Sequence, residues 1–134
     1  MEPARIAAIT VFAGVPDPEL AAVAAAVGEL EVEAGRPLAT EGDVGHALFA
    51  IESGSADVVV DGAVVRSVGP GDVVGEIAVL AAGRRTASVV ATSPMRLLVL
   101  FKRDVWRLER EAPAASARLR ELVSRHLAAA DAAS

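Results

Sequence analysis

Glycines interrupt the middle of the chain at short intervals, and this spacing limits what the chain can fold into. The segments between and after these glycines are short and rich in valine and other β-forming residues, at positions 47–52, 56–60, 64–68, 86–91 and 96–101. Short strands separated by glycine turns are typical of a β-barrel or a β-sandwich. The interrupting glycines are Gly35, Gly42, Gly45, Gly54, Gly62, Gly69, Gly71 and Gly75.

Two local patterns support strands in this region. Asp61-Gly62 stands between two valine runs, which predicts a hairpin with a two-residue turn. Leu30 and Val32 alternate with acidic residues, as in a half-buried strand that begins near Glu29. We therefore expect an antiparallel barrel over residues 29–102.

A helical period appears on both sides of the barrel segment. Before it, Asp17 predicts the cap of a helix from Pro18 to Val27, and a shorter helical piece is expected at residues 6–12. After it, Asp104 predicts the cap of another helix. In that helix, Trp106 is expected to anchor the core rather than to cover a bound base. Pro113 ends that helix and begins another.

The last predicted helix carries an apolar stripe, for which three interpretations stay open. The stripe packs on the barrel, or it forms a lid over a ligand, or it is the seam of a homodimer. Its residues are Leu119, Leu122, Val123 and Leu127. The whole chain is expected to form a single domain, mainly β with flanking α, with N-terminal helices in 1–28, the barrel in 29–102 and C-terminal helices in 103–134.

The composition excludes several functions. The chain has no cysteine, its net charge is −5 and 3% of its residues are aromatic, so neither thiol chemistry nor nucleic-acid binding is expected. No apolar run reaches the roughly 18–20 residues that span a bilayer, and we expect a cytoplasmic protein that does not bind membranes. His46 and His126 have no ligand partners at metal spacing and are expected on the surface.

Residues 74–88 carry the pattern that points to chemistry. Gly75 precedes an acid, a small-residue turn follows, and Arg85 stands nine residues after Glu76. A planar guanidinium suits two phosphate oxygens, whereas a carboxylate repels phosphate and accepts a hydrogen bond from a hydroxyl instead. The pair therefore indicates a sugar phosphate. An internal ion pair between Glu76 and Arg85, without a ligand, is the alternative.

This segment resembles the phosphate-binding cassette of cyclic-nucleotide-binding domains, as in protein kinase A regulatory subunits, catabolite activator proteins and cyclic-nucleotide-gated channels. The similarity covers residues 6 to 127 and includes an N-terminal helical motif and the order of the glycine turns. It implies a double-stranded β-helix, or jelly-roll, with C-terminal lid helices. The matching barrel turns are Ala34-Gly35, Glu41-Gly42-Asp43, Ser53-Gly54 and Gly69-Pro70-Gly71-Asp72.

The resemblance also implies roles for individual residues. Glu76 would bind the ribose 2′-hydroxyl and Arg85 the cyclic phosphate of cAMP or cGMP. Thr86 would add a hydroxyl contact, although it is equally well explained as a β-former and does not decide between the two bases. The remaining expected ligand contacts are Gly75 and the backbone amides near Ile77, Ala78 and Ala87, with Val74, Leu122 and Val123 as possible neighbours of the base.

Two departures from the family pattern matter. Val74 replaces a common aromatic residue, and Arg84 replaces a proline that often precedes the arginine. Spacing favours Arg85 as the ligand residue, with Arg84 as a solvated loop residue. The helix–turn–helix of the bacterial transcription factors is not expected in the few residues after Pro113.

The expected function is a non-catalytic signalling module. It would need no cofactor, would bind a cyclic nucleotide and would shift its C-terminal helices, passing the change to an unidentified effector protein as a monomer or homodimer. A metal-dependent barrel enzyme would need clustered histidines and acids, which the sequence lacks. A ligand-free barrel that acts as a protein-interaction module is the other alternative.

Overall fold

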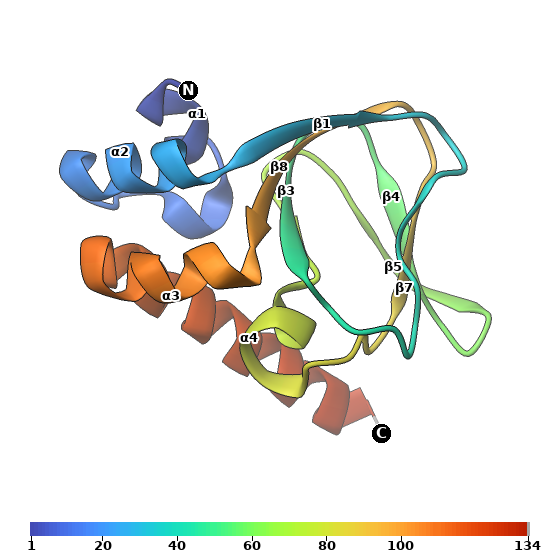
Figure 1. The fold of residues 1–134 in the computed structure, drawn as a ribbon. Helices are drawn as coiled ribbons and strands as arrows, with labels where there is room; N and C mark the ends of the chain where they lie inside the picture. Colours follow the sequence, from blue (N-terminus) through green and yellow to red (C-terminus); the bar gives the residue numbers. More distant parts are fainter. Residues whose placement is uncertain (134) are drawn as a thin grey trace.

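The computed structural model describes residues 1–133, and the side chains of residues 1–128. Helices from both ends of the chain gather on one side, and the strands form a barrel on the other (Figure 1). Within residues 1–133, eight strands form two four-stranded antiparallel sheets, in the orders β1-β8-β3-β6 and β2-β7-β4-β5. This is the predicted jelly-roll, flanked by helices.

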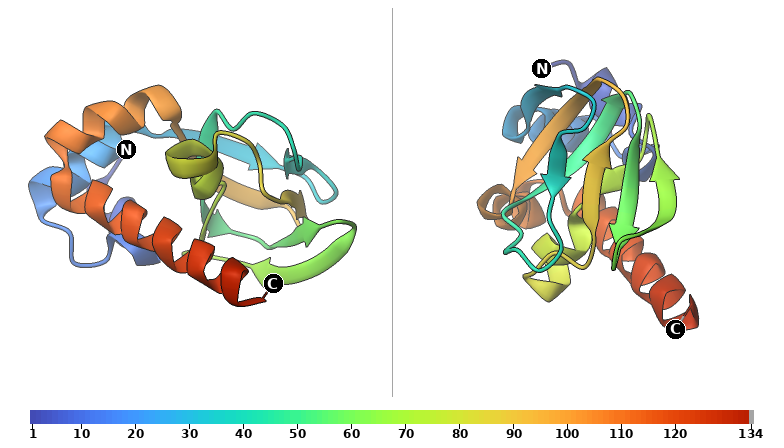
Figure 2. Two further views of the ribbon diagram at one scale, coloured as in Figure 1. Left: turned by 90° about the horizontal axis from the view of Figure 1, so that it is seen from below. Right: turned by 90° about the vertical axis from the view of Figure 1, so that its right-hand side faces the viewer.

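Six of the eight described strands lie close to segments predicted from the sequence, whereas the short strands at residues 37–39 and 73–74 were not predicted. The first sheet contains β1 (Gly28–Val32), β3 (Ala47–Ser53), β6 (Val73–Val74) and β8 (Met95–Phe101). The second contains β2 (Pro37–Ala39), β4 (Ala56–Val60), β5 (Ala63–Val68) and β7 (Ser88–Ala91). The views in Figure 2 show the two sheets enclosing the barrel interior, with the helices outside the first sheet.

Alternation along the strands divides the apolar side chains between two cores. In β3, Leu48 and Ala50 pack among the helices, whereas Ile51 faces the barrel interior. In β8, Leu98 and Leu100 face the helices and Leu97 faces the interior. Because successive side chains of a strand point to opposite faces, the first sheet is covered on both sides.

The predicted hairpin is confirmed. Asp61 and Gly62 connect β4 to β5, and both have positive φ, 51° and 80°. Positive φ at both central positions matches the tight turn that an Asp-Gly pair favours. The register then shifts: Val58 lies opposite Arg66 and Val59 opposite Val64, so Val65 is an extra residue in a β-bulge.

The helices are α1 (Pro3–Ala7), a 3₁₀ turn η1 (Thr10–Phe12), α2 (Asp17–Ala26), α3 (Lys102–Glu111) and α4 (Pro113–Ala133). Proline separates α3 from α4 as predicted. Both predicted capping residues are wrong: α2 begins at Asp17 itself, and α3 begins at Lys102 directly after β8. Asp104 instead lies in the first turn of α3, where its negative charge interacts favourably with the helix dipole. It also pairs with Arg107 at 3.6 Å.

The prediction that Trp106 anchors the core is also wrong. Its surface is 63% exposed, whereas Val105 and Leu108 of the same helix are 3% and 2% exposed. Ala112, directly after the last residue of α3, is also buried, so the positions of the buried stripe are three and four residues apart. Trp106 lies next to that stripe in sequence and therefore points away from the core. No helix in the described part of the chain is apolar over a length that would cross a bilayer.

Arg5 of α1 connects the helical layer to the first sheet. It donates two hydrogen bonds to the Glu52 carboxylate, 2.9 Å from Nε and 2.6 Å from Nη2, and it also pairs with Glu29 of β1. Hydrogen bonds from the guanidinium, together with its positive charge, lower the pKa of Glu52 below its ordinary value of 4.5. The ionised form of Glu52 is therefore favoured by folding.

This pair predicts a contribution to acid sensitivity. A lowered pKa gives stability that is present above the pKa of the unfolded chain and is lost as pH falls through the folded value. Urea unfolding at about pH 7 and about pH 3 should show a smaller loss of stability for Glu52→Gln than for the wild type. Glu31→Gln is the control, because its exposed pair with Arg96 contributes little. Equal losses in the wild type and Glu52→Gln would contradict the prediction.

Candidate functional site

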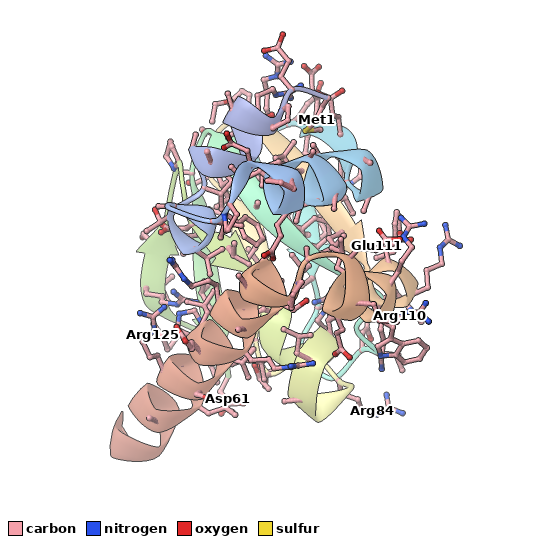
Figure 3. All side chains as sticks on the ribbon, turned by 90° about the vertical axis from the view of Figure 1, so that its left-hand side faces the viewer. Met1, Asp61, Arg84, Arg110, Glu111 and Arg125 are labelled. Atoms are coloured by element: carbon pink, nitrogen blue, oxygen red, sulfur yellow. The ribbon has the colours of Figure 1, made fainter. Side chains whose placement is uncertain are left out.

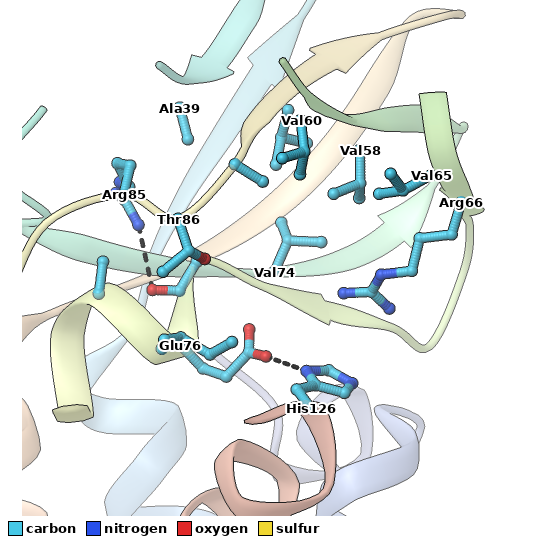
Figure 4. A pocket seen from close by; sticks show the side chains of 15 residues that line it. Ala39, Val58, Val60, Val65, Arg66, Val74, Glu76, Arg85, Thr86 and His126 are labelled. Atoms are coloured by element: carbon cyan, nitrogen blue, oxygen red, sulfur yellow. Dashed lines mark hydrogen bonds and ion pairs between the residues drawn. The ribbon is translucent and has the colours of Figure 1, made fainter. Parts of the chain in front are cut away.

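A cavity of about 440 Å³ opens between the second sheet, the segment after β6 and the C-terminal part of α4. Figure 4 shows its side chains. One wall is apolar and consists of Ala39, Val58, Val60, Val65, Val74 and Val89. The other lining residues are Gly75, Ile77, Ala78 and Ala87, with the polar side chains Arg66, Glu76, Arg85, Thr86 and His126. An apolar wall facing a few polar groups is typical of a site for a small organic ligand.

The segment after β6 folds back tightly. Gly75 has a φ of 82°, a helical turn follows, and its π-helical part spans Ala78–Ala82. Gly83 ends this turn with a φ of 76° and donates to the Ala78 carbonyl at 2.8 Å. The chain then returns past residues 42–45, where the Arg85 amide donates to the Asp43 carbonyl at 2.7 Å. These bonds bring Arg85 back beside Glu76.

Gly75 is the position where the backbone needs a glycine. Besides the positive φ, a Cβ placed there would lie 2.5 Å from Nη1 of Arg85 and 3.3 Å from the Ala47 carbonyl oxygen. Both contacts are shorter than normal van der Waals separations. The missing side chain therefore leaves the space through which the Arg85 guanidinium reaches the cavity.

Arg85 is buried, and its guanidinium is held in one orientation. Nη1 donates to the Gly75 carbonyl at 3.0 Å and Nη2 to the Ala47 carbonyl at 2.7 Å. The guanidinium also lies 5.9 Å from the centre of the Phe49 ring. Burial lowers the pKa of Arg85, and the negative charge of Glu76 acts in the opposite direction. A guanidinium has more N–H donors than these two carbonyls use, so donors are left for an anion.

Glu76 is 2% exposed, and one of its oxygens is engaged by the C-terminal helix. His126 Nδ1 contacts Oε1, and the other carboxylate oxygen points to the cavity side in Figure 4. No ion pair joins Glu76 to Arg85 among the described side chains, so the alternative of an internal Glu–Arg pair is wrong. The prediction of a surface position for His126 is also wrong, because 77% of its side chain is covered.

Arg84 and Arg85 differ in their exposure and in their position at the cavity, as the spacing from Glu76 predicts. Arg84 is exposed, projects at the edge of the molecule in Figure 3 and donates from Nη1 to the Gly42 carbonyl at 3.0 Å. It does not line the cavity, whereas Arg85 does. The structure also brings Gly75, Glu76, Ile77, Ala78, Thr86 and Ala87 to the same cavity.

Of the three residues expected to lie near the base, only one lines the cavity. Val74 lines the cavity, but Leu122 packs against the helical core and Val123 is buried, and neither lies in the cavity wall. The reason is the position of α4, which passes along the helical layer before it reaches the barrel (Figure 1). The residue that reaches the cavity is His126, one turn beyond Leu122.

Arg66 and His126 are cavity residues that the sequence did not reveal. The bulge at Val65 changes the alternation of β5, so the consecutive residues Val65 and Arg66 both line the cavity. His126 stands four residues after Leu122, which places both on one side of a helix. That spacing was the available signal for His126. Among the described residues, no three His, Asp or Glu side chains gather as metal ligands.

Residues 29–111 match the family model described as the cyclic nucleotide-binding domain. The chain belongs to this family. The match includes the whole segment from Val74 to Ser88, and it ends before α4, so His126 lies outside it.

Two curated relatives of the domain carry cyclic AMP (cAMP) in their names. The chain is 36% identical over 102 residues to the cyclic AMP receptor protein of Thermus thermophilus, covering 72% of this chain and 47% of that protein. It is 39% identical over 66 residues to a cAMP-dependent protein kinase regulatory subunit of Yarrowia lipolytica, covering 49% of this chain and 18% of that subunit. The domain thus spans less than half the length of these relatives.

A solved structure of a related protein has the same fold as this domain. The catabolite activator protein of Thermus thermophilus superposes with a TM-score of 0.81 at 31% identity, over 91% of this chain and 60% of that one. The shared part thus includes most of the helices as well as the barrel of the domain.

Proposed function

We propose that this domain binds cAMP or cGMP as a non-catalytic signalling module. The observation that carries the proposal is the arrangement of Arg85 and Glu76 at one cavity. Arg85 is fixed by carbonyls and keeps donors for an anion, while Glu76 keeps one oxygen for a hydroxyl. A ribose cyclic phosphate presents both groups close together.

The cavity suggests how the ligand lies. The cyclic phosphate takes the end with Arg85, the first amides of the turn at Ile77 and Ala78, and the segment at Thr86 and Ala87, where anion binding by backbone N–H groups is favourable. The ribose then lies beside Glu76. The base extends along the valines of β4 and β5, because that wall is apolar and purine faces are desolvated there. Both purines fit this description.

Signalling follows from the way α4 reaches the site. His126 brings α4 into the cavity wall, so a ligand that favours one position of α3 and α4 shifts their equilibrium. One relative named above is a regulatory subunit of a protein kinase. We propose that an effector protein in the cytoplasm detects this shift. The domain needs no cofactor in this scheme.

Isothermal titration calorimetry with cAMP, cGMP and 5′-AMP tests the function. We expect at least one cyclic nucleotide to bind, and 5′-AMP to bind more weakly, because its dianionic open phosphate does not match a site shaped for a ring. Absence of binding by both cyclic nucleotides would overturn the proposal. That result would favour the ligand-free interaction module, since His126 already provides a partner for Glu76.

A further inference from the structure

His126 is the part of α4 that touches the proposed ligand site. Among the described side chains that line the cavity, it alone comes from the helices outside the barrel and its turn. The family match ends at Glu111, so His126 lies outside the matched residues. The inference below rests on the proposed function and adds a residue to it.

The Glu76 carboxylate needs a donor where it lies. Glu76 is 2% exposed, and a buried carboxylate without a hydrogen-bond partner is costly. Arg85 does not fill this role, because its described hydrogen bonds go to the carbonyls of Gly75 and Ala47. His126 Nδ1 contacts Oε1, and since an ionised carboxylate only accepts hydrogen bonds, the imidazole is the donor.

The two oxygens of the Glu76 carboxylate have different surroundings. One oxygen is bound by His126, and the other points to the cavity side (Figure 4). A ribose hydroxyl can therefore donate to the second oxygen while the imidazole stays in place. Helix α4 and the hydroxyl thus bind the same carboxylate without excluding each other.

We propose that His126 is a positioning residue that holds Glu76 for recognition of the ribose 2′-hydroxyl and so couples this hydroxyl to the docking of α4. The hydrogen bond to one oxygen already restricts rotation of the Glu76 carboxylate. Binding of the hydroxyl therefore does not have to restrict it again. By reciprocity, the bound hydroxyl strengthens the docking of α4 to the same degree.

Calorimetric titration with matched nucleotides tests this coupling. The wild type, His126→Ala and His126→Asn are titrated with cAMP and 2′-deoxy-cAMP, and with cGMP and its 2′-deoxy analogue. We expect His126→Ala to lose about tenfold or more in affinity for the ribonucleotide, the size expected for a hydrogen bond to a charged group. Its affinity for the 2′-deoxy analogue should change little. His126→Asn should recover part of the loss, because its amide N–H replaces the Nδ1–H donor.

His46→Ala is the matched control. His46 is the other histidine, it is exposed, and it does not line the cavity, so both affinities should match the wild type. Equal losses for the ribose and 2′-deoxy ligands in His126→Ala would overturn the inference, since they would indicate a general structural role. Unchanged or tighter ribonucleotide binding would overturn it as well, because α4 would then compete with the ligand. Failure of the wild type to bind any of these nucleotides would instead overturn the proposed function itself.

Discussion

Replacing Arg85 by alanine is expected to weaken cyclic-nucleotide binding by about 2–5 kcal/mol, roughly 30- to 5,000-fold. The guanidinium is buried and oriented by the carbonyls of Gly75 and Ala47, so its remaining donors are already in place for a phosphate. Without it, the phosphate would be desolvated beside Glu76 and would lose the guanidinium that these carbonyls hold in place. Calorimetric titration of the variant with the nucleotide that binds the wild type measures the loss.

Arg84→Ala is the control for this result. Its side chain has the same charge and is adjacent in sequence, but it is exposed and lies outside the cavity wall. We expect nearly wild-type affinity for it. Full binding by Arg85→Ala would contradict the proposed role, and a large loss in Arg84→Ala alone would assign the phosphate to the other arginine. Circular dichroism should confirm that both variants are folded, because Arg85 also bonds to the backbone.

The largest effect on stability is expected for Gly54→Ala, in the turn after β3. Gly54 has a φ of 89°, and an added Cβ would collide with the Pro94 carbonyl and lie 2.8 Å and 2.9 Å from atoms of Met95. Met95 is 2% exposed and belongs to the barrel core, so neither neighbour can move freely. We expect a loss of about 3 kcal/mol or more in the free energy of unfolding, measured by urea denaturation.

Gly62→Ala separates the two causes of this loss. Gly62 also has a positive φ, 80°, but nothing lies within 4 Å of an added Cβ. Its cost is expected to be that of the left-handed conformation alone, about 1–2 kcal/mol. If the two variants lost equal stability, the collision at Pro94 and Met95 would not be the cause.

The barrel was predictable because its signals are local. The glycine spacing and the Asp61-Gly62 pair depend on backbone conformations that neighbouring residues set, and the structure has the corresponding strands and turn. Which strands pair with each other was not predicted, because pairing joins residues that are far apart in the sequence. The cassette around Glu76 was predictable for a different reason: its residues stand within one short segment.

The remaining cavity residues depend on contacts across the chain. Arg66 reaches the cavity because of a register shift between β4 and β5, and no short pattern in the sequence encodes that shift. His126 reaches it because α4 packs along the helical layer first, which determines where each turn of α4 meets the barrel. Trp106 was predicted in the core but is exposed, because the buried stripe of α3 is set by Val105 and Leu108.

The first sheet has the helical core on one face and the barrel core on the other. Removing the N-terminal helices would therefore expose part of the apolar face of β3 and β8 to water. One of these strands, β3, supplies the Ala47 carbonyl that orients Arg85. The barrel is thus not an independent fragment to which helices were added. A minimal ligand-binding unit cut from this domain would have to retain both layers.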